Sequence, residues 1–115
     1  MSDPAEIGTI LYPAGDIERS LAFYRDGLGL AVKFRDGDRF AALDGGTVTL
    51  GLAGAAEDVA GGVAASFKVA DVEATVTRMV AAGGTVVVPA EQGPHEIRAV
   101  VRDPAGNAVI VYRAT

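Results

Sequence analysis

The sequence contains no cysteine, and this absence excludes several kinds of chemistry. Without a thiol the chain forms no disulfide, has no thiolate nucleophile and offers no sulfur ligand to a metal. A basic stripe is also absent, since 10 Lys and Arg residues stand against 15 Asp and Glu residues, for a formal net charge of −5. This balance argues against nucleic acid as the main partner, although it allows a small anion bound by one local Lys or Arg.

Long hydrophobic runs are lacking as well. No apolar run approaches the roughly 20 residues that a membrane helix needs. The first residues, MSDPAEIGT, are neither basic nor apolar, unlike those of a signal peptide. We therefore expect a cytoplasmic protein without a membrane partner. Half of the 115 residues are hydrophobic, and this length and composition suit one domain with a real core.

What the sequence does contain is an internal repeat. The segments AGDIERSLAFYRDGLGL (14–30) and VADVEATVTRMVAAGGT (69–85) align with Asp16 on Asp71. Each begins with an aspartate suited to cap a helix, continues with apolar residues at helical spacing and ends in glycine. The same order of signals in both halves of a short chain indicates two copies of one structural unit.

Strand-like segments surround both predicted helices. They cover residues 6–12, 30–35, 39–44 and 47–53 in the first half, and 63–69, 85–91, 96–102 and 107–113 in the second. Asp-Gly turns separate the strands of the first half, and DPAG favours a type I turn in the second. This order predicts a single domain over residues 1–115, built from two βαβββ units (5–53 and 63–115) that a small-residue linker (54–62) joins.

Two segments carry a family resemblance: GDIERSLAFYRDGLGL (15–30) and RDPAGNAVIVYR (102–113). They resemble the first helix and the terminal hairpin of the vicinal oxygen chelate superfamily, which includes glyoxalase I, bleomycin-resistance proteins, fosfomycin-resistance enzymes and extradiol dioxygenases. The resemblance covers nearly the whole chain. It implies an α+β fold in which the two βαβββ repeats form a pair of half-barrels around a concave cavity. Because this fold serves many chemistries, it assigns no activity by itself.

The resemblance also implies a divalent-metal site, with a His in the first strand of a unit and a Glu in its last strand as typical ligands. The corresponding positions in this sequence are Thr9 and Ala64 for His, and Leu50 or Gly51 and Ile110 for Glu. Only the threonine carries a side-chain donor, whereas a transition-metal site usually needs roughly three or four ligands. We therefore predict no metal and no other cofactor, which argues against metal-dependent glyoxalase or dioxygenase activity. A site built from His95, Glu91 and Glu96 is a remote alternative.

Strand alternation predicts which side chains face the cavity, if Thr9 and Ala64 occupy the family's ligand positions. The resulting surface is mainly apolar with a few polar groups, which suits an organic ligand oriented by hydrogen bonds. The side chains of Phe34 and Phe40 either pack in a core or stack on a flat ligand. The predicted ligand-binding residues are Thr9, Leu11, Phe34, Phe40, Leu50, Ser66, Lys68, Arg98, Ile110 and Tyr112. The strand phase around residues 91–102, and with it the face of Arg98, is left open. The side chains expected to face the helices instead are Ile10, Tyr12, Ala65, Phe67, Val69, Val109 and Val111.

Two functions are compatible with these residues. The first is a metal-independent protein of the bleomycin-resistance type, which sequesters an aromatic or amphipathic molecule in antibiotic resistance or secondary metabolism. Members of that branch are homodimers, so we expect a homodimer with a small organic ligand as partner. The second is a metal-free lyase, isomerase or cyclase in which Lys68, His95, Glu96 or Tyr112 transfers protons. For His95 the competing interpretation is a polar hairpin tip, and for Lys68 a solvated lysine. Pairing of the repeats within one chain or across a dimer is left open.

Overall fold

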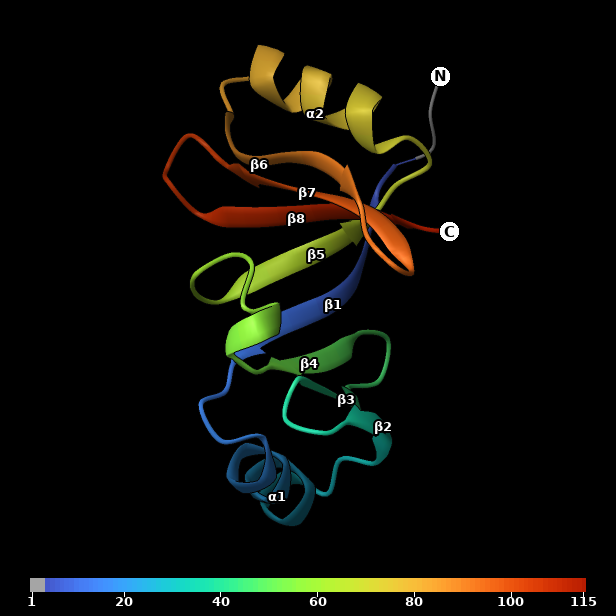
Figure 1. Cartoon of the computed structure of the whole chain (residues 1–115), viewed down its shortest axis with the longest axis vertical. Coiled ribbons are helices and arrows are strands. Elements are labelled where there is room, and N and C mark those ends of the chain that lie inside the picture. The colour runs from blue at the N-terminus through green and yellow to red at the C-terminus, as the bar shows by residue number, and fades with distance from the viewer. Residues whose placement is uncertain (1–3) are drawn as a thin grey trace. The chain divides into compact units, whose positions relative to one another are not determined.

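The computed structural model describes residues 4–115 and divides into two compact units (Figure 1). The N-terminal unit is Thr9–Val63, and the C-terminal unit combines Ala64–Thr115 with residues 4–8. The order of elements is βαβββ followed by βαβββ, which confirms the predicted α+β fold with an internal repeat. The predicted linker contains one short 3-10 helix, η1 (Ala55–Glu57).

The N-terminal unit contains α1 (Ile17–Leu28) and four strands in the order β2-β3-β4-β1. The strands are β1 (Glu6–Pro13), β2 (Val32–Asp36), β3 (Phe40–Asp44) and β4 (Thr49–Ala53). β1 runs parallel to β4, and the other neighbours are antiparallel. Asp16 caps α1, because its carboxylate accepts a hydrogen bond from the Arg19 backbone N–H at 3.1 Å. Gly29, at φ 72°, ends the helix in the left-handed conformation that glycine adopts without strain.

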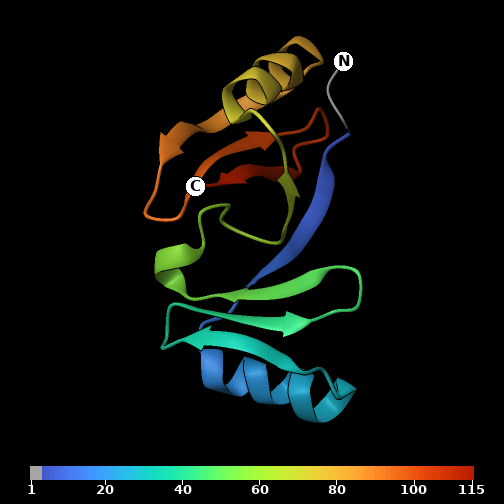
Figure 2. The same cartoon turned by 90° about the vertical axis from the view of Figure 1, so that its right-hand side faces the viewer.

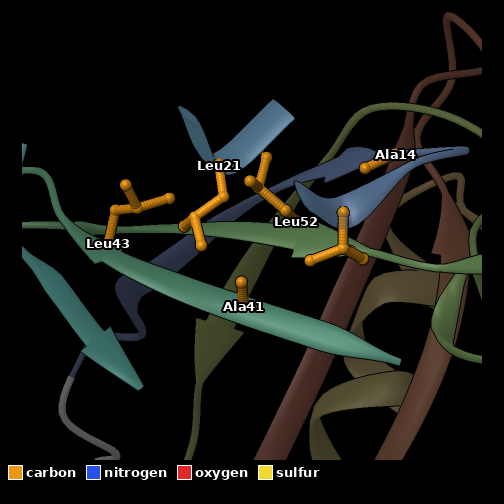
Figure 3. Packing of buried hydrophobic residues seen from close by; sticks show 6 residues of the cluster. Ala14, Leu21, Ala41, Leu43 and Leu52 are labelled. Atoms are coloured by element: carbon orange, nitrogen blue, oxygen red, sulfur yellow. The ribbon is translucent and has the colours of Figure 1, made fainter. Parts of the chain in front are cut away.

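One face of these strands packs against α1 (Figure 2). The buried core between them consists of Ala14, Ile17, Leu21, Ala41, Leu43 and Leu52, most of which Figure 3 labels. Tyr12 packs against this core, as strand alternation predicts. Because successive residues of a strand point to opposite faces, the alternate residues of β1, β3 and β4 lie on the face opposite α1.

The C-terminal unit repeats the plan with α2 (Val72–Ala81) and strands in the order β5-β8-β7-β6. The strands are β5 (Ala64–Lys68), β6 (Thr85–Gln92), β7 (Glu96–Arg102) and β8 (Ala108–Ala114). Asp71 caps α2 by accepting a hydrogen bond from the Ala74 backbone N–H at 3.0 Å. Phe67, Val69 and Val109 pack with Val111 against α2, which confirms their predicted orientation. Ser66, Lys68, Ile110 and Tyr112 alternate with them and so lie on the face opposite α2.

Candidate ligand-binding site

The N-terminal unit gathers side chains over Gly51 on the face opposite α1. Gly51 of β4 stands beside Leu11 of β1 in the parallel register. A Cβ atom added at Gly51 would lie 2.9 Å from Cζ of Phe40, 3.0 Å from Cγ2 of Thr9 and 3.1 Å from Cδ1 of Leu11. Because Gly51 has no side chain, three of the predicted ligand-binding residues pack over it: Phe40, Thr9 and Leu11.

A pair of aromatic rings extends this surface toward the edge of the sheet. The ring centroids of Phe34 and Phe40 lie 5.7 Å apart, with their planes tilted by 33°. Phe40 is half-buried over Gly51, whereas Phe34, on the edge strand β2, is 54% exposed. Neither ring belongs to the core beneath α1. Phe34 is thus exposed and Phe40 packs over Gly51, and stacking of a ligand on the two rings stays a prediction.

Two polar residues that the sequence analysis missed lie on the same face. The Lys33 ammonium donates a hydrogen bond to Oγ1 of Thr49 at 2.8 Å. Thr49 stands beside Thr9 in the β1–β4 register and two residues before Gly51, so both threonines share the face opposite α1. The register of β2 shifts between Val32 and Phe34, which leaves Lys33 as an extra residue. Such a bulge re-aims a side chain in a way that alternation in the sequence does not reveal.

One predicted residue of this unit lies on the other face. Leu50 packs against the core beneath α1 and stands beside Ile10 in the β1–β4 register. The placement of Leu50 on the ligand-facing surface is therefore wrong. Of the two positions considered for the family's glutamate, Gly51 is the one that shares a face with Thr9. The physical reason is the two-residue period of a strand, in which a shift by one residue exchanges the faces.

The C-terminal unit aligns a row of polar side chains across its four strands. Lys68 of β5 stands beside Tyr112 of β8, Tyr112 faces Arg98 of β7, and Arg98 faces Glu91 of β6. Directly paired residues point to the same face, so the row lies opposite α2. This register also settles the strand phase of Arg98, which sequence alone did not fix. Ser66 and Ile110 form the neighbouring pair and are 9% and 4% exposed.

Tyr112 is the electrostatically perturbed member of this row. Burial raises the pKa of its phenol, and the negative charge of Glu96 raises it further. Glu96 lies near Arg98 as well, with 3.9 Å between the carboxylate oxygen and the guanidinium nitrogen. The Tyr112 hydroxyl lies so close to Gly8 that a Cβ atom at position 8 would overlap it. Glycine on β1 thus makes room for a phenol that stays protonated at neutral pH.

His95 lies in the exposed turn between β6 and β7. Its backbone carbonyl accepts a hydrogen bond from the Thr115 N–H at 3.0 Å. Within residues 4–115, no three His, Asp or Glu side chains are grouped so that they would hold a metal ion. The alternative ligand set of His95, Glu91 and Glu96 is therefore not assembled as such a group.

The structure also has an open depression of about 480 Å³ on the other side of the C-terminal sheet. Its lining residues are Ala70, Asp71, Val72, Glu73, Ile97 and Arg113. None of them is among the ligand-binding residues predicted from the sequence. It surrounds the first turn of α2, where Asp71 already accepts a hydrogen bond from the helix backbone. Asp71 therefore already has a structural role there as the cap of α2.

Comparison with known proteins identifies the family. The model of the Glyoxalase/Bleomycin resistance protein/Dioxygenase superfamily matches residues 6–111. The chain belongs to this superfamily. An uncharacterized protein of Mycolicibacterium smegmatis is 41% identical over 113 residues, which cover 97% of this chain and 96% of that protein.

Two solved structures illustrate the similarity of fold. A Legionella pneumophila protein described as NAD-dependent benzaldehyde dehydrogenase has a TM-score of 0.81 at 20% identity, with 97% of this chain and 100% of that chain covered. Methylmalonyl-CoA epimerase of Streptomyces coelicolor has a TM-score of 0.76 at 23% identity, with 98% and 99% covered. At these identities the likeness concerns the fold alone. No helix in residues 4–115 is both long and apolar enough to cross a membrane.

Proposed function

We propose that this superfamily member binds a small organic molecule, aromatic or amphipathic, on the face of the N-terminal unit opposite α1. The observation that carries the proposal is the Phe34–Phe40 ring pair, in which Phe40 packs over Gly51 beside Thr9 and Leu11. Aromatic rings held on a sheet offer a flat ligand a large contact area at a small cost in conformational entropy. Thr9, Thr49 and Lys33 supply the few polar groups that orient such a ligand.

Binding in this proposal needs no metal. The residues at the positions of the family's metal ligands support this, because Thr9, Gly51, Ala64 and Ile110 together offer one neutral hydroxyl. Divalent transition metals in proteins are bound mainly by imidazole, carboxylate or thiolate groups, which these positions lack. The proposal extends to a cytoplasmic homodimer that sequesters its ligand in antibiotic resistance or secondary metabolism. A symmetric dimer is also the commonest state of soluble oligomers.

Native mass spectrometry of the tag-free protein tests the proposal. The protein is incubated with a metabolite extract of its source organism, desalted, and measured before and after EDTA treatment. We expect an organic mass that survives EDTA in the wild type and is lost in Phe40→Ala. Phe23→Ala is the matched control, because Phe23 is an exposed aromatic residue on α1. Retention of the mass by Phe40→Ala, or its loss with a stoichiometric metal on EDTA treatment, would contradict the proposal.

The second candidate function is metal-free proton transfer on the face of the C-terminal unit opposite α2. The observation in its favour is the row of Lys68, Tyr112 and Arg98, which brings a protonated phenol between two cations. A phenol with a raised pKa is a proton donor rather than a base at neutral pH. If the captured molecule is converted during incubation and Tyr112→Phe stops the conversion, this function replaces simple sequestration.

A further inference from the structure

Lys33 differs from the neighbouring cations in its bonding. Arg35 forms ion pairs with Glu18 and Asp38, and Arg39 forms ion pairs with Asp36 and Glu57. No ion pair given by the described residues includes Lys33, whose ammonium is bonded to the neutral hydroxyl of Thr49. An ammonium has three N–H donors. The bond to Thr49 uses one of them, so Lys33 keeps further donors and its full positive charge for a ligand.

Asp44 is the acidic residue to consider as an ion-pair partner of Lys33. It stands opposite Thr49 in the β3–β4 register, and therefore on the same face. Its carboxylate accepts a hydrogen bond from the Gly46 backbone N–H at 2.8 Å, which holds it in the turn after β3. The described ion pairs do not join Asp44 to Lys33. Lys33 thus donates to a neutral hydroxyl, and none of the ion pairs found in residues 4–115 gives it a carboxylate partner.

The bulge in β2 places this charge beside the aromatic pair. In a regular strand Lys33 and Phe34 would point to opposite faces. The register shift between Val32 and Phe34 removes that alternation. Lys33 reaches Thr49, and Phe34 packs against Phe40, so consecutive side chains serve one face. Bulges of this kind are frequent next to binding sites, where they re-aim a side chain.

From this juxtaposition we infer that the ligand is a planar organic anion, with an aromatic ring on Phe34 and Phe40 and a carboxylate or phenolate oxygen on Lys33. The inference rests on the proposed function and specifies its ligand class. Stacking supplies affinity for any flat molecule, whereas the ammonium discriminates between an anion and its neutral analogue. The hydroxyls of Thr9 and Thr49, next to each other on β1 and β4, offer further donors to the same anion.

The test compares two probes of similar shape and different charge, 2-naphthoate and 2-naphthamide. Each is titrated into ¹⁵N-labelled protein, and its dissociation constant is obtained from the amide chemical shifts. For the wild type we expect binding of naphthoate to be tighter by about tenfold. Lys33→Gln should abolish this preference and Lys33→Arg should keep it. Asp44→Asn should strengthen naphthoate binding, because it removes a negative charge from the same face. Lys68→Gln tests whether the anion binds on the C-terminal unit instead. Arg19→Gln is the control, since it removes an exposed cation from α1, on the other face of the N-terminal unit.

The outcomes separate this inference from the proposed function. Equal affinities for the two probes, both lost in Phe40→Ala, would overturn the anion site and leave aromatic binding intact. A preference for naphthoate that survives Lys33→Gln but is lost in Lys68→Gln would likewise overturn it, and would place the anion on the C-terminal unit. Absence of binding by either probe would overturn the inferred ligand class, while capture of an organic mass from extract would still support the proposed function.

Discussion

The ring of Phe40 packs directly over Gly51, and its Cζ would lie 2.9 Å from a Cβ atom at position 51. Substitution Gly51→Ala must therefore displace side chains, and those nearest belong to the proposed ligand site. We expect a loss of roughly 1–3 kcal/mol in the free energy of unfolding, typical of overpacking, and weaker binding of naphthoate. Urea denaturation measures the free energy of unfolding. Titration of ¹⁵N-labelled protein with naphthoate, followed by amide chemical shifts, measures the affinity.

Gly27→Ala is the matched control for that substitution. Gly27 lies in the last turn of α1, and a Cβ atom there meets nothing within 4 Å. Alanine is favoured over glycine in a helix by up to about 1 kcal/mol, so this variant should be as stable as the wild type or more so. Equal ligand affinity in Gly51→Ala and Gly27→Ala would mean that the region over Gly51 does not contact the ligand.

The aspartates that cap α1 and α2 should contribute equally to the free energy of unfolding. Asp16 and Asp71 accept hydrogen bonds from the backbone N–H three residues later, at 3.1 and 3.0 Å. Substitution of either by alanine should lower the free energy of unfolding by about 1 kcal/mol, and substitution by serine should largely preserve it. Chemical denaturation of the four variants gives the comparison. Unchanged stability in both alanine variants would refute the capping role in this repeat.

The core beneath α1 should respond far more strongly than the helix surface. Leu43 is fully buried, and Leu43→Ala should cost about 2–5 kcal/mol because it leaves a cavity. Leu28 is 67% exposed near the end of the same helix, and Leu28→Ala should change stability by less than about 0.5 kcal/mol. Midpoints of urea unfolding for the two variants check this contrast. Similar losses would mean that Leu28 is covered in solution.

The phenol of Tyr112 should titrate above the ordinary range of tyrosine. Burial is the main cause of its raised pKa, and the charge of Glu96 adds to it, so Glu96→Gln should lower the pKa without restoring the ordinary value. A raised pKa means that the folded protein holds this proton more tightly than the unfolded chain. The corresponding stability is present below about pH 10 and is lost as the pH rises through the folded-state pKa.

Ultraviolet absorbance of phenolate, measured as the difference between wild type and Tyr112→Phe, isolates this titration from those of Tyr12 and Tyr24. The same subtraction in the Glu96→Gln background gives the effect of the carboxylate. A Tyr112 pKa that rises, or does not move, when Glu96 is neutralised would contradict the electrostatic part of this description.

Much of the fold was predictable because its signals are local. The aspartate caps, the helical apolar stripes and the Asp-Gly turns act over a few residues, and they repeat in both halves of the chain. Strand alternation from Thr9 also assigned Leu11 correctly to one face, and Tyr12 to the other. These features depend on neighbours in the sequence and need no knowledge of the distant packing.

The site was harder to predict, because it depends on registers between strands. Leu50 and Gly51 exchange faces with a shift of one residue, and nothing in TVTLGLA fixes that shift. Lys33 shares a face with Phe34 only because of a bulge, which alternation does not anticipate. Arg98 required the β7–β8 pairing to be placed beside Tyr112. Each of these is a non-local relationship that forms when the sheet does.

The most direct test of the account is a chemical-shift map of ligand binding in EDTA-treated protein. We predict that 2-naphthoate perturbs the backbone amides of Thr9, Phe34, Phe40 and Gly51 without added metal, and that added Zn²⁺ changes neither the pattern nor the affinity. Perturbations confined to the C-terminal unit, or binding that requires Zn²⁺, would contradict metal-independent recognition on the face opposite α1.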